Sequence, residues 1–299
     1  MHDSVEPTEP GRPVETFETY RAYLFSIAYR MLGSVMDAED VVQETYLRYQ
    51  GRQAENIESL KAYLTTILTR LCLNQLQLAY RRRETYLGPW LPEPLVTGES
   101  FEQASPEQRV DEYESVSLAF LVLLEQLQPV ERAVFLLREV FDYEYDEIAA
   151  FLGKNEAACR QSFSRAKKHL ADHHPRFPAP RALHTQMLTS FIQAVQLGDM
   201  DSLMHMLADD VVLWADGGGK VKGAATRPIV GRLYVARFSM GTTRFLPEGA
   251  QIEVEQVNGQ PAVVVRTPER VYLVLSIEMV AQRIQTIRII ANPDKLTRV

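Results

Sequence analysis

The residues best suited to chemistry in this sequence lie on one side of a helical pattern over residues 155–170. At about 100° per residue, Cys159, Phe163, Ala166 and Leu170 form one apolar stripe. The opposite side presents small, polar and basic residues, namely Ala157, Ala158, Gln161, Ser164, Arg165 and Lys168. Small residues allow close approach to a duplex, and amide, hydroxyl and cationic groups can hydrogen-bond base edges and phosphates. This side, with Asn155 and Arg160 added, is a candidate DNA-contacting surface.

The elements that would position this surface span residues 129–170. They read as a helix, a short helix, a tight turn and the basic helix. Gly153 suits the left-handed residue that ends a helix, and Asn155 is a good N-cap for the next one. Such a helix-turn-helix places its second helix in the major groove. These residues fit an ordinary helical hairpin with a solvated basic face equally well.

A second polar surface is expected on the helix that follows Gly33-Ser34. Its apolar side is formed by Val41, Val42, Thr45, Tyr46 and Tyr49, and Asp37, Asp40, Gln43 and Glu44 lie largely opposite. Acidic residues in a first turn interact favourably with the helix dipole, so capping and solvation are one interpretation. An acidic docking surface for a basic protein partner is the other.

Composition limits the classes of protein that the chain can be. Its 299 residues are enough for two or three domains, and its net charge of −7 argues against a protein that coats nucleic acid while allowing a local basic patch. Cys72 and Cys159, the two cysteines, fall in helical patterns and are expected to be buried free thiols. We expect no metal site and no cofactor. Without a signal peptide or an apolar run of about 18 residues, we expect no membrane contact and a cytoplasmic location.

The pattern along the chain divides it into six parts. We expect a disordered leader (1–14), an all-α domain (15–83), a Pro/Gly-rich linker (84–112), a second helical domain (113–170), a second linker (171–184) and a C-terminal domain (185–299). In the last part, helices over 185–197, 200–208 and 230–240 accompany strands at 211–215, 252–257, 262–267, 271–277 and 283–290. Asn258-Gly259 predicts a hairpin turn. This part is predicted to be α+β with an antiparallel sheet.

Taken in order, these pieces resemble bacterial sigma factors of the extracytoplasmic-function (ECF) class, and specifically the subgroup with a SnoaL-like C-terminal extension. Residues 25–32 and 37–44 look like the first sigma domain, and residues 129–170 look like the second. Three motifs are hallmarks of the subgroup: Trp90-Leu91-Pro92-Glu93-Pro94-Leu95, Asp216-Gly217-Gly218-Gly219-Lys220 and Asn292-Pro293-Asp294-Lys295-Leu296. The resemblance implies a multidomain fold, with two all-α sigma domains, the second a helix-turn-helix, and an α+β cone-shaped SnoaL-like domain.

The resemblance also implies roles for the candidate residues. Asp37, Asp40, Gln43 and Glu44 would bind core RNA polymerase, and the basic helix would read the minus-thirty-five element of promoter DNA. The helix over 60–83 would open and read the minus-ten element with Tyr63, Asn74, Arg81, Arg82 and Arg83. At residues 74–77 many relatives read Asp-Arg-Leu-Arg, whereas this chain has Asn-Gln-Leu-Gln. Fewer phosphate contacts would make minus-ten binding weaker or differently specific.

For the C-terminal domain the resemblance implies regulation of the sigma domains in cis, through Trp90, Leu91, Pro92 and the two later motifs. The residues themselves predict that 216–220 is an exposed turn with a charge at each end, and that 292–296 is a second charged turn. Trp214 and Asp216 are expected near a cone mouth, but no pair of carboxylates is spaced for acid–base work, so we expect no enzyme. The alternatives are a SnoaL-type enzyme or small-molecule sensor fused to a DNA-binding module, and a conventional helix-turn-helix repressor.

Overall fold

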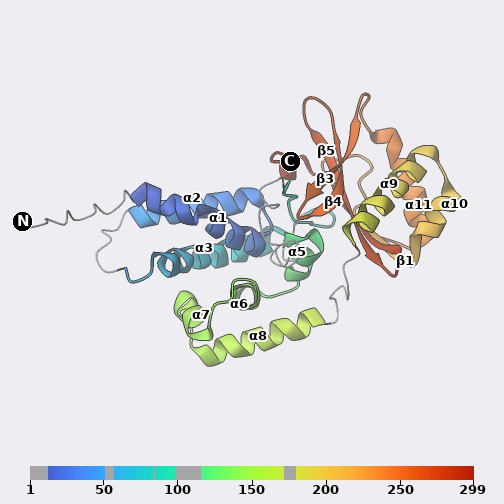
Figure 1. Ribbon diagram of the computed structural model, residues 1–299. Helices are drawn as coiled ribbons and strands as arrows, with labels where there is room; N and C mark the ends of the chain where they lie inside the picture. Colours follow the sequence, from blue (N-terminus) through green and yellow to red (C-terminus); the bar gives the residue numbers. More distant parts are fainter. Residues whose placement is uncertain (1–12, 51–56, 84, 98–115, 172–179) are drawn as a thin grey trace, which may run out of the picture.

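Helices make up the first half of the protein, and a sheet with three helices makes up the rest (Figure 1). The computed structural model describes residues 13–50, 57–83, 85–97, 116–171 and 180–299. The expected leader and parts of both expected linkers lie outside these residues. The helices of the first half are α1 (Pro13–Leu32), α2 (Val35–Gln50), α3 (Leu60–Arg83), α5 (Leu118–Leu124), α6 (Pro129–Glu139), α7 (Tyr145–Leu152) and α8 (Glu156–Ala171).

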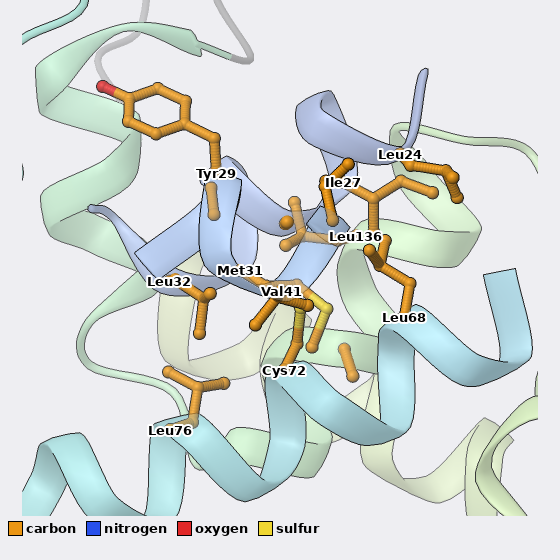
Figure 2. Packing of buried hydrophobic residues seen from close by; sticks show 14 of the residues in the cluster. Leu24, Ile27, Tyr29, Met31, Leu32, Val41, Leu68, Cys72, Leu76 and Leu136 are labelled. Carbon is orange, nitrogen blue, oxygen red and sulfur yellow. The ribbon is translucent and has the colours of Figure 1, made fainter. Parts of the chain in front are cut away.

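The first three helices pack around one apolar core because their leucines, isoleucines and methionines repeat at helical spacing. Leu24 and Ile27 of α1 meet Leu68 of α3, and all three are fully buried. Figure 2 shows Leu136 of α6 among these side chains, so the core continues into the second helical unit. The two helical units therefore share one core in this arrangement.

Helices α6, α7 and α8 form the expected helix-turn-helix. Gly153 ends α7 in the left-handed conformation with φ 61°, and the side chain of Asn155 accepts a hydrogen bond of 2.8 Å from the backbone N–H of Ala158. Cys159 is buried on the apolar side of α8, as its spacing predicted, and Cys72 is buried in α3. Helix α5, which comes before α6, covers Leu118–Leu124.

The C-terminal part contains α9 (Arg181–Leu197), α10 (Met200–Met206), β1 (Leu207–Asp216), β2 (Ile229–Val230), α11 (Arg232–Thr242), β3 (Gln251–Val257), β4 (Gln260–Arg266), β5 (Val271–Val280) and β6 (Arg283–Ile290). Two single-turn 3₁₀ helices, η2 (Thr243–Phe245) and η3 (Pro293–Lys295), follow α11 and β6. This α+β fold was expected. Helix α9 begins four residues before the predicted helix start, directly after Pro180, a position that tolerates a residue without a backbone N–H.

The sheet differs from the antiparallel one that the pattern predicted. Its strand order is β2-β1-β6-β5-β4-β3, and β1 pairs with β6 in parallel while the other neighbours are antiparallel. Alternation of side chains indicates which residues share a face of a strand, but it does not determine which strands pair. The prediction failed at the pair that is farthest apart in sequence.

The two faces of the sheet pack against different partners. Leu213 and Ala215 join a core with helix α9, whereas Val274 and Ile290 contact Leu91 from the first linker. Residues 95–97 of this linker lie along the edge strand β3, where Val96 bridges Val257. The described part of this linker therefore docks on the sheet.

Candidate functional site

The DNA-contacting surface predicted on α8 is exposed in the structure. Ala157, Arg160, Gln161, Ser164, Arg165 and Lys168 are exposed and Ala158 is half-buried, while Cys159, Ala166 and Leu170 are buried against the rest of the unit. The first turn of α8 therefore offers small residues, and its later turns offer amide, hydroxyl and cationic groups. Such a helix face can lie in a major groove.

Two arginines of α8 have partners that fix their side chains. The guanidinium of Arg165 pairs with the buried carboxylate of Glu131 on α6 at 2.9 Å. Arg160 lies over the ring of Tyr145, with 4.6 Å between the guanidinium carbon and the ring centroid. These contacts limit the freedom of both side chains, and the carboxylates of Glu131 and Glu156 offset the charges of Arg165 and Arg160.

The acidic side of α2 is divided between exposed and bonded residues. Asp40 and Gln43 are exposed. Asp37 accepts a hydrogen bond of 3.0 Å from Gln75 of α3, and Glu44 pairs with Arg48 at 2.8 Å. Gln75 is one of the positions where the sequence departs from many relatives, and here it orients Asp37.

On α3 the candidate minus-ten residues Tyr63 and Asn74 are eleven positions apart and so lie on one side of the helix. Tyr63 is half-buried and Asn74 is exposed. Arg70 lies between them and donates hydrogen bonds to the carbonyl oxygens of Phe151 and Ala150, at 2.9 and 3.3 Å, at the end of α7. The helix-turn-helix thus contacts this side of α3. The side chains of Arg81, Arg82 and Arg83 lie outside the part that the structure describes.

The structure brings the three subgroup motifs together in one cluster between the sheet and the linker. Asp216, expected in an exposed turn, has 0 % exposure and accepts hydrogen bonds from the backbone N–H of Leu91 at 2.9 Å and from the Tyr86 hydroxyl. Its neighbours Leu213 and Ala215 face α9, so Asp216 and Trp214 alternate away from the interior of the cone. The expected position near a cone mouth was wrong, because the side chain of Asp216, the last residue of β1, faces the linker.

Lys295 completes this cluster. Its side chain is 7 % exposed, pairs with Asp216 at 2.7 Å and donates a hydrogen bond to the carbonyl oxygen of Leu91. The ammonium also lies 4.0 Å from the ring centroid of Trp90. We call Tyr86, Trp90, Leu91, Asp216, Asn292 and Lys295 the interdomain cluster. The Asp216 carboxylate and the Lys295 ammonium therefore bind the backbone N–H and the carbonyl oxygen of Leu91.

Other motif residues support this cluster at short range. Asn292 donates to the Tyr86 hydroxyl at 2.8 Å, and burial, followed by the Asp216 contact, raises the pKa of that tyrosine. A Cβ on Gly218 would lie 2.5 Å from the Asn292 amide, so only glycine fits between the two motifs. Lys220 pairs with Asp294 at the surface. The remaining members of the predicted set, Pro92, Gly217, Gly219, Pro293 and Leu296, lie in the same three segments.

Two interdomain residues were missed by sequence reasoning. Asn258, predicted only as a hairpin turn, is 1 % exposed, and its side-chain amide group donates to the Tyr29 hydroxyl at 2.6 Å and to the Val116 carbonyl at 3.0 Å. It also exchanges hydrogen bonds with the backbone of Leu95. Its positive φ of 52° fits the turn prediction, but that signal says nothing about burial.

The second missed residue is Glu93, in the first motif. Its carboxylate accepts hydrogen bonds from the backbone N–H groups of Val35 and Met36, at 2.7 and 3.2 Å, and from the Ser34 hydroxyl at 2.8 Å. These groups form the first turn of α2, so a linker residue caps this helix. Burial raises the pKa of Glu93, and its hydrogen bonds oppose that shift.

The described residues hold no candidate for two other kinds of site. Within the described ranges, no three histidine, cysteine, aspartate or glutamate residues are grouped so that they could hold a metal ion. None of the helices in those ranges has the length and apolar character needed to cross a membrane.

Comparison with known protein families identifies both helical units. Residues 16–84 match the family described as Sigma-70 region 2, and residues 117–170 match the family described as Sigma-70, region 4. The second match covers the helix-turn-helix and settles the choice between that motif and an ordinary helical hairpin.

Similar proteins extend the likeness to nearly the whole chain. The ECF RNA polymerase sigma factor SigJ of Mycobacterium tuberculosis is 35 % identical over 294 residues, covering 95 % of this chain and 93 % of that protein. A probable ECF RNA polymerase sigma factor, SigI, from the same species is 30 % identical and covers 94 % and 93 %. The crystal structure of SigJ superposes with a TM-score of 0.73 at 34 % identity and covers 94 % of this chain and 97 % of that one.

Proposed function

This chain belongs to the ECF RNA polymerase sigma factors, and we propose that its C-terminal domain regulates promoter-specific initiation in cis by binding the linker between the two sigma domains. The observation that carries the proposal is the buried Asp216–Lys295 pair, which is bonded to both polar groups of Leu91. A linker held in this way limits how far apart the two sigma domains can move.

We assign the remaining surfaces by the same reasoning. The side of α2 with Asp37, Asp40, Gln43 and Glu44 binds core RNA polymerase. Tyr63 and Asn74 on α3, with Arg81, Arg82 and Arg83, contact the minus-ten element. The exposed side of α8, from Asn155 to Lys168, contacts the minus-thirty-five duplex. These roles place the protein in the cytoplasm with polymerase and promoter DNA.

We also propose that the C-terminal domain acts by contact and not by catalysis. Asp216 lies on the sheet face opposite α9, and its oxygens are occupied by Tyr86, Leu91, Gly218 and Lys295. Burial lowers the pKa of His184, which lies on α9, and therefore favours its neutral form. The likeness to sigma factors along the whole chain gives the alternatives of an enzyme fusion and a repressor no support.

Removing the charge of Lys295 tests the regulatory proposal. In Lys295→Met the buried carboxylate of Asp216 loses its counter-charge, and breaking such a pair typically costs about 3–5 kcal/mol. We expect lower stability in urea and a changed yield in run-off transcription with core polymerase. The double variant Asp216→Asn with Lys295→Met leaves no unpaired charge and should recover much of the stability. Transcription that matches the parent chain in both variants would refute regulation through this contact.

The assignment of α8 is tested with two neighbouring lysines. Lys168 belongs to the exposed polar side, whereas Lys167 pairs with Glu139 of α6 at 3.2 Å. Lys168→Gln should weaken binding of the holoenzyme to a minus-thirty-five duplex. The slope of log K against log salt concentration should become shallower by about 0.9 for each phosphate contact that is lost. Lys167→Gln is the matched control. If the two variants bind alike, α8 does not present Lys168 to DNA.

A further inference from the structure

A basic surface on the C-terminal domain takes no part in the interdomain cluster. Between Gly217 and Pro247 the sequence has six lysines and arginines and no aspartate or glutamate, although the chain carries a net charge of −7. This segment contains the turn after β1, strand β2, helix α11 and η2. Figure 1 shows α11 on the side of the sheet away from α1, α2 and α3. It is therefore not covered by the sigma helices.

Two of the six cations are neutralised within the fold. Lys220 pairs with Asp294, and Arg232 pairs with Asp209. The other four, which we call the basic surface, are exposed and lack a carboxylate partner in the part of the chain that the structure describes: Lys222, Arg227, Arg237 and Arg244. Because no carboxylate of the described residues offsets these charges, an external anion would lower their electrostatic free energy.

Two of these cations lie on either side of an open glycine at the end of α11. Arg237 lies on α11 and Arg244 on η2, seven residues later, with Gly241 between them. A Cβ added to Gly241 would meet no atom within 4 Å. The surface at Gly241 is therefore open.

An aromatic ring connects this side of α11 with the preceding turn. The guanidinium carbon of Arg244 lies 4.7 Å from the ring centroid of Phe245. Gly223, beside Lys222, packs so closely that an added Cβ would lie 2.6 Å from the same ring. Phe245 is 48 % exposed and Tyr234 on α11 is 65 % exposed. Cations next to exposed rings are a common feature of nucleic-acid-binding surfaces.

We propose that this basic surface contacts the phosphate backbone of promoter DNA flanking the minus-thirty-five element. Duplex DNA carries one negative charge per about 1.7 Å of its axis, so it supplies a row of anions for cations spread over a turn, a helix and a 3₁₀ turn. The inference rests on the proposed function, because binding of α8 at the promoter brings flanking DNA close to the same chain. The contact would add affinity without reading sequence.

The test compares two pairs of arginines in the full chain bound to core polymerase. Arg237→Gln with Arg244→Gln removes two charges of the basic surface. Arg270→Gln with Arg283→Gln removes two exposed arginines of the same domain outside it. For long promoter fragments, we expect the Arg237/Arg244 variant to have a slope of log K against log salt concentration that is shallower by up to about two. Its hydroxyl-radical footprint should also be shorter in the DNA that flanks the minus-thirty-five element. The control pair should leave both unchanged.

Three outcomes would overturn the inference. The first is an unchanged salt slope and footprint in the Arg237/Arg244 variant, and the second is an equal loss in the control pair. The third is weaker binding of core polymerase without a change in DNA binding, because that result would assign the surface to a protein partner. Fragments trimmed to the two promoter elements should bind the variant and the parent chain alike. The Lys168→Gln measurement separates this inference from the proposed function, because it depends on α8 alone.

Discussion

At the scale of single residues, Asn258 connects the three parts of the protein. Its side chain bonds Tyr29 of α1, the linker backbone at Leu95, and the carbonyl oxygen of Val116, just before α5. Only a carboxamide offers an acceptor and two donors in this geometry. The residue is also in the left-handed region, which asparagine tolerates better than most residues. Its identity is therefore constrained by both its backbone and its partners.

Asn258→Asp should destabilise the protein although it hardly changes the shape of the side chain. The carboxylate has no N–H groups, so the Val116 carbonyl and the Tyr29 hydroxyl lose their donor, at about 1–3 kcal/mol for each buried group left unsatisfied. Urea denaturation at neutral pH measures the loss. Asn258→Gly keeps the positive φ accessible and adds no charge, so its loss should be smaller. Equal stability of the Asp variant and the parent would show that these hydrogen bonds contribute nothing.

At the scale of elements, the linker between the two sigma domains also stabilises one of the sigma helices. Glu93 caps α2, and the Tyr29 hydroxyl donates to the Glu93 carbonyl oxygen at 2.6 Å. Helix α2 carries the residues that we assign to polymerase binding. The conformation of the linker is thus coupled to the first turn of that helix.

Glu93→Ala should weaken this coupling. Loss of a helix cap costs about 0.5–2 kcal/mol, and fraying of the first turn displaces Asp37 and Asp40. We expect lower affinity for core polymerase in a fluorescence-anisotropy titration. Glu93→Gln retains a carbonyl oxygen as acceptor and should lose less, and Glu18→Ala, an exposed change on α1, should lose nothing. A parent-like affinity of Glu93→Ala would contradict the role of the cap.

At the scale of the whole molecule, the two sigma domains are packed against each other. Arg132 of α6 is almost completely buried and donates to the Met31 carbonyl oxygen at the end of α1, and burial lowers its pKa to about 10. The Tyr23 hydroxyl donates to the Tyr143 hydroxyl at 2.6 Å across the same interface. Together with Arg70, these contacts hold the helix-turn-helix over α3. The binding of the minus-ten element that we propose for this side of α3 would therefore require the two domains to separate.

Tyr143→Phe tests this arrangement without changing a residue assigned to DNA. The Tyr143 hydroxyl, which this substitution removes, also lies 3.2 Å from the Thr65 hydroxyl of α3. Hydrogen bonds of this kind contribute about 0.5–1.5 kcal/mol each to stability. Fluorophores on α3 and α7 should report a larger average separation in the free protein, with tighter binding of single-stranded minus-ten DNA. Tyr20→Phe, the same substitution made on α1, is the control. An unchanged separation would mean that the hydroxyl does not hold the domains together.

Features that depend on nearby residues could be predicted from the sequence. The stripe of Cys159, Ala166 and Leu170 gave the buried side of α8, and Gly153 and Asn155 gave the turn before it. Helical periodicity and caps involve groups within a few positions of one another, so they are visible without a fold. The family followed from ordered motifs for the same reason.

The burial and the partners of the charged motif residues depend on contacts between distant segments. Asp216 and Lys295 are 79 positions apart, and Asn258 and Tyr29 are 229 apart. A charged residue beside three glycines has the local pattern of an exposed turn, and the expectation for Asp216 was wrong because the partner that compensates its burial comes from another segment. The parallel pairing of β1 with β6 could not be predicted either, because the two strands are far apart in the sequence. Local sequence reports propensity, whereas the pairing of distant polar groups depends on the packing of the whole chain.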